Sequence, residues 1–140
     1  MEGLLSKSNL PSTLFKTSAV LNLVSVPGHI VFGRQKLEPF LEDYSYNPAL
    51  GVSIAAARVG WSHMTVSIIT AAALNWHWSS SGGPELVHEQ IIFWSVLVSG
   101  AYVGAKYWRE GEYAPLACLW VAPLCSLVAW VLNQRKDLDS

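Results

Sequence analysis

Charge is scarce in this chain of 140 residues, and the little that is present lies in short clusters. Only 14% of the residues are Asp, Glu, Lys or Arg, against roughly 25% in soluble domains. Several long stretches carry no charged residue at all: 17–33, 44–57, 59–84, 90–105 and 113–134. Charge-poor stretches separated by short polar links are typical of a polytopic helical membrane protein. The formal net charge of −1 offers no excess of positive charge, so we expect no nucleic-acid partner.

Residue patterns that hold metals or phosphate groups are also missing. The two cysteines, Cys118 and Cys125, stand too far apart to form a Cys-x-x-Cys pair, and packing is their simplest role. No HExxH-type pattern occurs, and the run 81–83 is better explained as a turn than as a phosphate-binding loop. We therefore expect no metal and no cofactor. The first apolar stretch lacks the cleavage site of a signal peptide, so we expect a retained span.

The apolar stretches are long enough to cross a bilayer, because a hydrocarbon core of about 30 Å needs about 20 helical residues. We predict an all-α polytopic membrane protein, with residues 1–140 forming one antiparallel four-transmembrane-helix bundle. The spans are expected at about 14–32, 48–75, 88–107 and 114–132. Both termini and the loop 79–85 would lie on one side, and the links 33–47 and 108–113 on the other. Lys and Arg residues are balanced between the two sides, so the orientation stays open.

Polar side chains in each span fall on one face of the predicted helix. The first span carries four of them at a spacing of three or four residues: Ser18, Asn22, Ser25 and His29. This spacing places them on one stripe, which we expect to face the bundle interior, where hydrogen-bond partners exist. Small and hydroxyl residues in such helices are most simply packing residues. The same principle makes Gly100-x-x-x-Gly104 a helix contact that could join two copies in a homodimer.

Arg58 is the residue that this bundle must accommodate. It follows Pro48 by roughly 15 Å of helix, which places it near the midplane, where an unpaired charge costs at least a few kcal/mol. We therefore expect Arg58 to face the interior, within reach of the polar stripe of the first span and under a lid formed by 34–47. A lid carboxylate or the substrate would supply the counter-charge, the carboxylates being Glu38, Glu42 and Asp43. His29 and Tyr102 could converge on the same half of the bundle, either for function or as a lock that fixes helix register.

Two functions agree with these features. The first is a membrane-embedded, cofactor-independent enzyme that acts by acid–base chemistry on a lipophilic intermediate, through cyclisation, isomerisation or epoxide opening. Glu38 or Asp43 would donate the proton. Arg58 would hold an oxyanion or a carboxylate, and His29 would take a proton back. The expected substrate-binding residues are Asn22, Ser25, Trp61 and Tyr102. The second function is a non-catalytic membrane binding or assembly protein, or one half of a dimeric small-molecule transporter.

The four-span layout, Arg58 within a span and the polar link EPFLEDYSYNP resemble the small four-helix membrane proteins of fungal natural-product pathways. More broadly, the layout is similar to that of four-span DoxX-type proteins. The resemblance covers the whole chain at the level of layout, and no catalytic motif is carried over residue by residue. Some of these fungal proteins act as cyclases, isomerases or epoxide-opening enzymes on polyketide or terpenoid intermediates. The resemblance therefore implies secondary-metabolite biosynthesis in the endoplasmic-reticulum membrane, with a lipophilic substrate and membrane lipid as partners.

Overall fold

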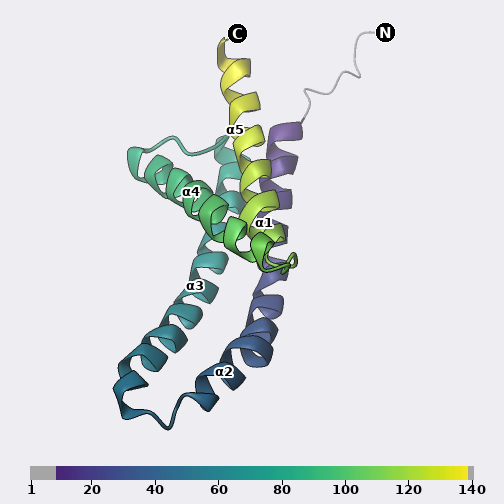
Figure 1. The fold of residues 1–140 in the computed structure, drawn as a ribbon. Helices are drawn as coiled ribbons and strands as arrows, with labels where there is room; N and C mark the ends of the chain where they lie inside the picture. The colour runs from purple at the N-terminus through teal and green to yellow at the C-terminus, as the bar shows by residue number, and fades with distance from the viewer. Residues whose placement is uncertain (1–8, 139–140) are drawn as a thin grey trace.

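The computed structural model describes residues 9–138, and the regular elements among them are all helical (Figure 1). In chain order they are α1 (Leu10–Phe32), the π-helical segment η1 (Gly33–Leu37), α2 (Glu38–Asp43), the 3₁₀ turn η2 (Pro48–Leu50), α3 (Gly51–Ser81), α4 (Val87–Arg109), the π-helical segment η3 (Ala117–Val121) and α5 (Ala122–Leu138). Because α1, η1 and α2 are continuous and η3 runs directly into α5, the described residues form four long helices. The predicted all-α fold is confirmed at this level.

Local chemistry explains where several of these helices begin and end. The side chain of Asn47 accepts a hydrogen bond from the backbone N–H two residues later and so starts η2, which leads into α3. α3 ends at Ser81, and the next residue, Gly82, caps it with a φ of 94°, in the left-handed region that glycine tolerates. The Glu89 carboxylate accepts hydrogen bonds from the N–H groups of Glu85 and Leu86. These bonds satisfy backbone donors that would otherwise be unpaired at the start of α4.

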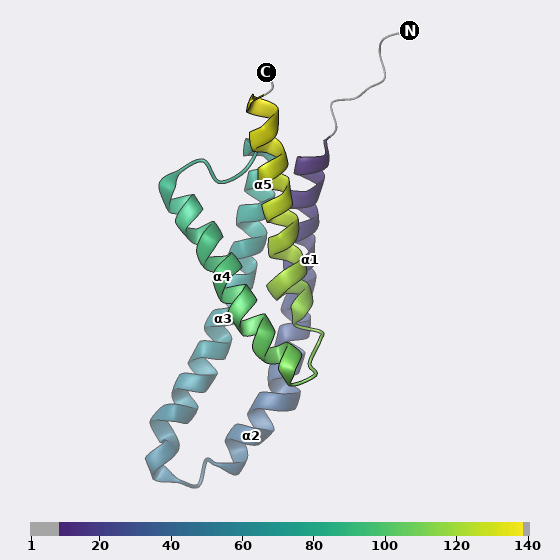
Figure 2. The ribbon, with the colours of Figure 1, turned by 45° about the horizontal axis from the view of Figure 1, so that its top comes forward.

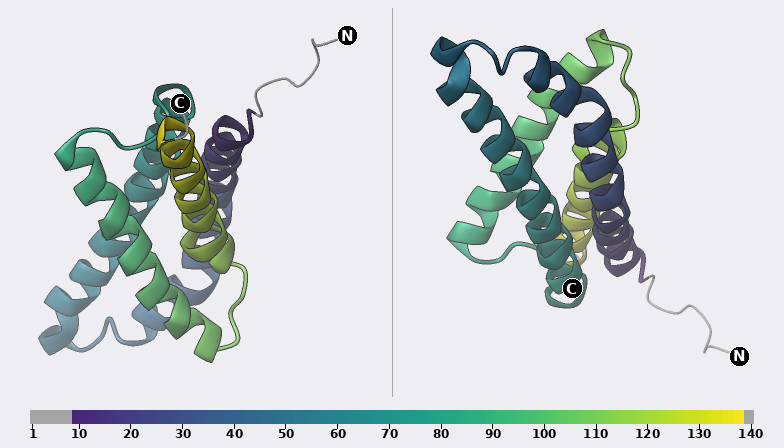
Figure 3. Two further views of the ribbon diagram at one scale, coloured as in Figure 1. Left: turned by 90° about the horizontal axis from the view of Figure 1, so that it is seen from above. Right: turned by 90° about the horizontal axis from the view of Figure 1, so that it is seen from below.

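α1 is the central helix of the fold. It makes its main contacts with α3 and α5, and it runs antiparallel to both (Figures 1 and 2). α4 crosses the other helices obliquely, as the end-on views in Figure 3 show, and its main contacts are with η3. The helices therefore alternate in direction as predicted, but α4 departs from the uniform alignment of a simple bundle.

Aromatic side chains fill the end of the bundle that lies nearer the chain termini. The buried core consists of Phe15, Trp78, Phe93 and Ala129, one from each long helix. The Trp78 ring centroid lies 6.3 Å from that of Phe15 and 5.9 Å from that of Phe93. These are tilted and edge-to-face contacts, which aromatic pairs prefer. The core therefore joins all four helices at one level, directly beside the buried polar residues described below.

The stretch 33–47, predicted to be a polar link and a lid, is mostly helical. It prolongs α1, so that Leu10–Asp43 is one helix of 34 residues, and only 44–47 form the turn. Figures 1 and 2 show this extension projecting together with the first half of α3 beyond α5. We call this projection, made of η1, α2 and the facing part of α3, the helical arm. Its sequence favours helix because Gln, Lys, Leu and Glu are good helix formers and Pro39 stands in the first turn of α2.

Gly100 and Gly104 pack within the chain. A Cβ atom added at Gly100 would overlap the backbone oxygen of Leu119, and one added at Gly104 would overlap the ring of Trp120. Both partners belong to η3, so the two glycines allow α4 and η3 to approach closely. The homodimer contact expected through Gly100 and Gly104 stays a prediction; in the structure, Leu119 and Trp120 of the same chain lie against these two glycines.

Large apolar side chains cover much of the outer surface. Examples from three of the long helices are Val24 (67% exposed), Val59 (62%) and Val98 (64%). Two helices, Leu10–Asp43 and Ala117–Arg135, are long and apolar enough to span a membrane. The four predicted spans thus correspond to four helices, and two of these helices have the composition of a membrane span.

Candidate functional site

Four buried polar side chains meet between the helices, and we call them the polar cluster. They are Ser18 and Asn22 of α1, Asn75 of α3 and Ser126 of α5. None exposes more than 6% of its surface. Ser18 and Asn22 belong to the polar stripe predicted for the first span, and they face the interior as expected. The burial of neutral amides and hydroxyls requires hydrogen-bond partners for them.

Ser126 links three of the helices. Its Oγ lies 2.8 Å from the Oγ of Ser18 and also contacts the Oδ1 of Asn75 and the backbone oxygen of Ala122. A hydroxyl carries one proton, and neither amide oxygens nor backbone carbonyls can donate. Ser18 therefore donates to Ser126, and Ser126 donates to Asn75, its nearer acceptor. This chain of hydrogen bonds ties α1 to α5 and α5 to α3.

The partners of the two asparagines fix the orientation of their amides. The Nδ2 of Asn22 donates to the backbone oxygen of Ser18 at 2.9 Å, and the Nδ2 of Asn75 donates to that of Ala71 at 2.8 Å. A backbone carbonyl only accepts, so the amide nitrogen must face it and the amide oxygen must point away. Ser126 uses the oxygen of Asn75. Among the described residues, none donates a hydrogen bond to the Oδ1 of Asn22, and this oxygen is not completely buried.

A cavity of about 20 Å³ lies against the polar cluster. This volume is enough for one water-sized group. All four cluster residues line it, and Asn22 is the member with an unused acceptor. Its other walls are mainly apolar and come largely from α3 and α4: Leu74, Trp78, Ile92, Phe93, Val96 and Leu97. A polar floor below apolar walls suits a molecule that has one polar group on an apolar body.

Arg58 lies on the surface of the helical arm. Its Nε and Nη2 donate to the Oε2 of Glu38 at 3.1 and 3.0 Å, and the two side chains remain 45% and 39% exposed. The predicted ion pair with a carboxylate of the 34–47 stretch is present, but the predicted interior position of Arg58 is wrong. Asn22 lies instead beside Asn75. Along the axis of α3, Asn75 is roughly 25 Å from Arg58. Arg58 is therefore out of reach of Asn22.

His29 occupies a third place, where α1 faces α3. Its ring stacks on that of Trp61 with centroids 4.1 Å apart and an interplanar angle of 9°. Its Nε2 lies 3.2 Å from the backbone oxygen of Trp61. On the other side Gly33 leaves room for the indole, because a Cβ there would overlap the Trp61 ring. His29 and Trp61 therefore form an aromatic contact between two helices.

The remaining predicted site residues do not join these groups. Ser25 donates to the backbone oxygen of Leu21 in its own helix. Tyr102 is 64% exposed, and the Nζ of Lys106 lies 4.5 Å from the centre of its ring. Asp43 is exposed at the end of α2. The expected single acid–base centre is thus divided among the helical arm, the His29–Trp61 contact and the outer face of α4.

Sequence reasoning missed Asn75 as a site residue and gave Ser126 no role beyond helix packing. Asn75 was placed at the end of a span, where a polar residue is unremarkable. The sequence feature that indicates a buried Asn75 is the pair Trp76 and Trp78, which follows it. Because α3 continues to Ser81, the Asn75 amide lies within the helix and not at its end. Ser126 stands between apolar neighbours on α5, and a lone serine there gives no warning of its partners.

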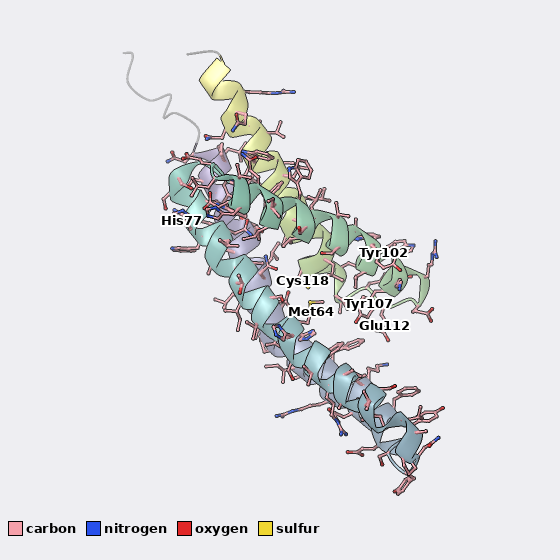
Figure 4. All side chains as sticks on the ribbon, turned by 90° about the vertical axis from the view of Figure 1, so that its left-hand side faces the viewer. Met64, His77, Tyr102, Tyr107, Glu112 and Cys118 are labelled. Carbon is pink, nitrogen blue, oxygen red and sulfur yellow. The ribbon has the colours of Figure 1, made fainter. Side chains whose placement is uncertain are left out.

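Two contacts between polar side chains lie near the helix ends, one of them an ion pair between Lys36 and Glu112. Figure 4 shows His77 at one end of α3 and Glu112 beyond the opposite end of α4. The Nε2 of His77 lies 3.7 Å from the Oε1 of Glu89, and the Nζ of Lys36 lies 3.4 Å from the Oε1 of Glu112. Within residues 9–138, no three His, Cys, Asp or Glu side chains gather closely enough to hold a metal ion.

Comparisons with known proteins identify no relative. No protein-family model matches the chain, and neither the curated proteins nor the solved structures include a match.

Proposed function

We propose that this chain is an integral membrane protein that binds a lipophilic small molecule between its four helices. The observation that carries this proposal is the apolar outer surface of the helices. Large apolar side chains lie on the outside, while a group of neutral polar side chains is buried around the cavity, beside the aromatic core. Such an arrangement is unfavourable in water and suits lipid, where polar groups must find partners inside the protein.

The helix lengths support four spans. At about 1.5 Å per residue, α3 with 31 residues is roughly 46 Å long and α4 with 23 residues is roughly 34 Å long. Both exceed the hydrocarbon thickness of about 30 Å. The 34-residue helix Leu10–Asp43 measures roughly 51 Å, so one end must leave the hydrocarbon. In this proposal the helical arm is that end, and Arg58 and Glu38 lie near the headgroups, where a charge costs less than at the midplane.

Joining the helices does not by itself account for all features of the polar cluster. Interhelical hydrogen bonds alone are common packing devices in membrane proteins. The cavity and the unused Oδ1 of Asn22 favour a ligand, because a packing device would satisfy its own acceptors. A lipophile would place its polar group on the cluster and its apolar body between α3 and α4. Localisation in the endoplasmic reticulum remains part of this proposal.

The test compares matched variants purified from alkali-washed membranes. Bound small molecules are extracted from the wild-type protein, from Asn22→Leu and from Ser95→Ala, and identified by mass spectrometry. The side chain of Ser95 is exposed on α4, and within the described part of the chain it hydrogen-bonds only to the backbone oxygen of Ile91, so Ser95 serves as the control. We expect a lipophile near one per protein in wild type and control, and its loss in Asn22→Leu. Equal recovery from all three proteins would contradict the proposal.

A second candidate function is acid–base catalysis on such a lipophile, for which the helical arm provides a specific observation. Arg58 pairs with Glu38, and Arg58 also borders an open hollow that includes His63. A guanidinium, a carboxylate and an imidazole near one surface can polarise an oxygen and transfer a proton. Expression with candidate pathway intermediates and mass spectrometry of the products tests this function. Arg58→Ala and Glu38→Gln should abolish product formation, and unchanged turnover in both would exclude the arm as the site.

A further inference from the structure

We infer that the ligand of the polar cluster is an alcohol: its hydroxyl group binds Asn22 and an unbranched apolar chain follows it between α3 and α4. This inference rests on the proposed function and specifies the chemistry of the bound molecule. It follows from the hydrogen-bonding capacity that the cluster leaves unused.

The unused capacity contains both an acceptor and donors. The Oδ1 of Asn22 has no partner among the described residues, and an amide nitrogen has two N–H groups. Asn22 and Asn75 each use one N–H group, toward Ser18 and Ala71 respectively. The second N–H group of each asparagine therefore has no partner among residues 9–138. A hydroxyl group can donate to the Oδ1 of Asn22 and accept from one of these N–H groups at the same time.

Other polar groups fit this cluster less well. A carboxylate only accepts and would leave the oxygen of Asn22 unpaired, and its charge has no counter-charge among Ser18, Asn22, Asn75 and Ser126. An ammonium group cannot accept and brings the same uncompensated charge. An ether or ketone oxygen accepts only, so the Oδ1 of Asn22 again stays unpaired.

The size of the cavity restricts what is attached to the hydroxyl. About 20 Å³ holds one small group, so branching next to the hydroxyl carbon would meet the cavity walls. Trp78 and Phe93, which are 3% and 4% exposed, close the cavity toward the aromatic core. The walls formed by Val96 and Leu97 of α4 continue away from that core. An unbranched alkyl chain beside them would bury apolar surface without displacing the core.

The test uses full-length protein in lipid nanodiscs with three probes of one chain length: hexadecanol, hexadecyl methyl ether and hexadecanoic acid. The thermal unfolding midpoint is measured against the mole fraction of each probe in the bilayer. We expect hexadecanol to raise the midpoint of wild type and of Ser95→Ala, and to act at an about tenfold lower mole fraction than the ether. The acid, measured at an alkaline pH where it is a carboxylate, should resemble the ether. Asn22→Leu should show no preference for the alcohol.

The outcomes separate this inference from the function on which it rests. Equal responses of wild type to alcohol and ether, with both responses lost in Asn22→Leu, would overturn the alcohol assignment and leave lipophile binding in place. No response of wild type to any probe would overturn both. Equal responses of wild type and Asn22→Leu to the alcohol would show an effect of the bilayer and would overturn the inference. If Asn22→Leu fails to fold, the comparison of alcohol with ether in wild type still decides.

Discussion

The Oγ atoms of Ser18 and Ser126 lie 2.8 Å apart, although 108 positions separate these residues in the chain. The contact joins α1 and α5. Among the described residues, no other side-chain hydrogen bond links these two helices. Because Ser126 donates a hydrogen bond to the Oδ1 of Asn75, the pair also fixes α3. The register of three helices is therefore set by neutral hydrogen bonds in the interior, and the ion pairs lie outside it.

This register predicts an energetic coupling between Ser18 and Ser126. A double-mutant cycle of Ser18→Ala and Ser126→Ala, measured by reversible unfolding in micelles, should give a coupling of about 0.5–1.5 kcal/mol. Ser99→Ala is the matched control, because Ser99 is exposed and bonds within α4. Its coupling with Ser18→Ala should be near zero. Independent effects of Ser18→Ala and Ser126→Ala would show that the two hydroxyls are not partners.

The glycine contacts predict opposite effects at two helical positions. Gly104→Ala should lower the free energy of unfolding by about 1–3 kcal/mol, because the new Cβ meets the Trp120 ring. Gly60→Ala, in the middle of α3 with open space around it, should raise stability by roughly 0.5–1 kcal/mol. Thermal unfolding of both variants measures the contrast. A stabilising Gly104→Ala would mean that α4 does not pack on η3 in this way.

The Arg58–Glu38 pair predicts a small effect on stability, because both side chains are partly exposed, at 45% and 39%. Arg58→Glu and Glu38→Arg should each change the free energy of unfolding by no more than about 1 kcal/mol, and the double swap should recover most of the loss. Chemical unfolding of the three variants provides the measurement. A loss of several kcal/mol in the single variants would indicate a buried lock instead.

The helix order predicts the side of the membrane on which each turn is found. In a protein with Cys118 and Cys125 replaced, Ser80→Cys should react with an impermeant thiol reagent from the side opposite to Tyr46→Cys. The reason is that α3 runs between these two positions and would cross the bilayer once. Labelling of intact and inverted vesicles makes the comparison. Reaction of both positions from one side would contradict a transmembrane α3.

The helices and the polar stripe of α1 could be predicted because their signals are local. The charge-free stretches predicted where the helices lie. The spacing of Ser18 and Asn22 predicted which face of α1 turns inward. The helical arm was missed because its charged residues suggested a loop, although their helix propensity is high. The interior position predicted for Arg58 was wrong, because its counter-charge lies on a continuous helix and not on a lid folded over the bundle. In the structure Arg58 pairs with Glu38, beyond the end of α1.

The polar cluster could be predicted only in part, because its assembly depends on the register between helices. Asn75 and Ser126 lie 51 positions apart, and no local pattern relates them. The contact arises because both α3 and α5 run antiparallel to α1 and present these residues at one level. The height at which each residue lies along the bundle depends on the turn lengths and on the tilt of each helix. Neither can be read from the type of a single residue.

Photocrosslinking tests most directly whether a lipophile binds at the polar cluster. A hexadecanol that carries a diazirine in its chain is added to nanodiscs that contain the protein, and modified residues are mapped by mass spectrometry. The proposal predicts modification of the cavity side of α4, at Ile92, Val96 and Leu97, and a clear reduction in Asn22→Leu. Modification confined to outward-facing residues such as Val87 and Val98, equal in wild type and Asn22→Leu, would contradict it.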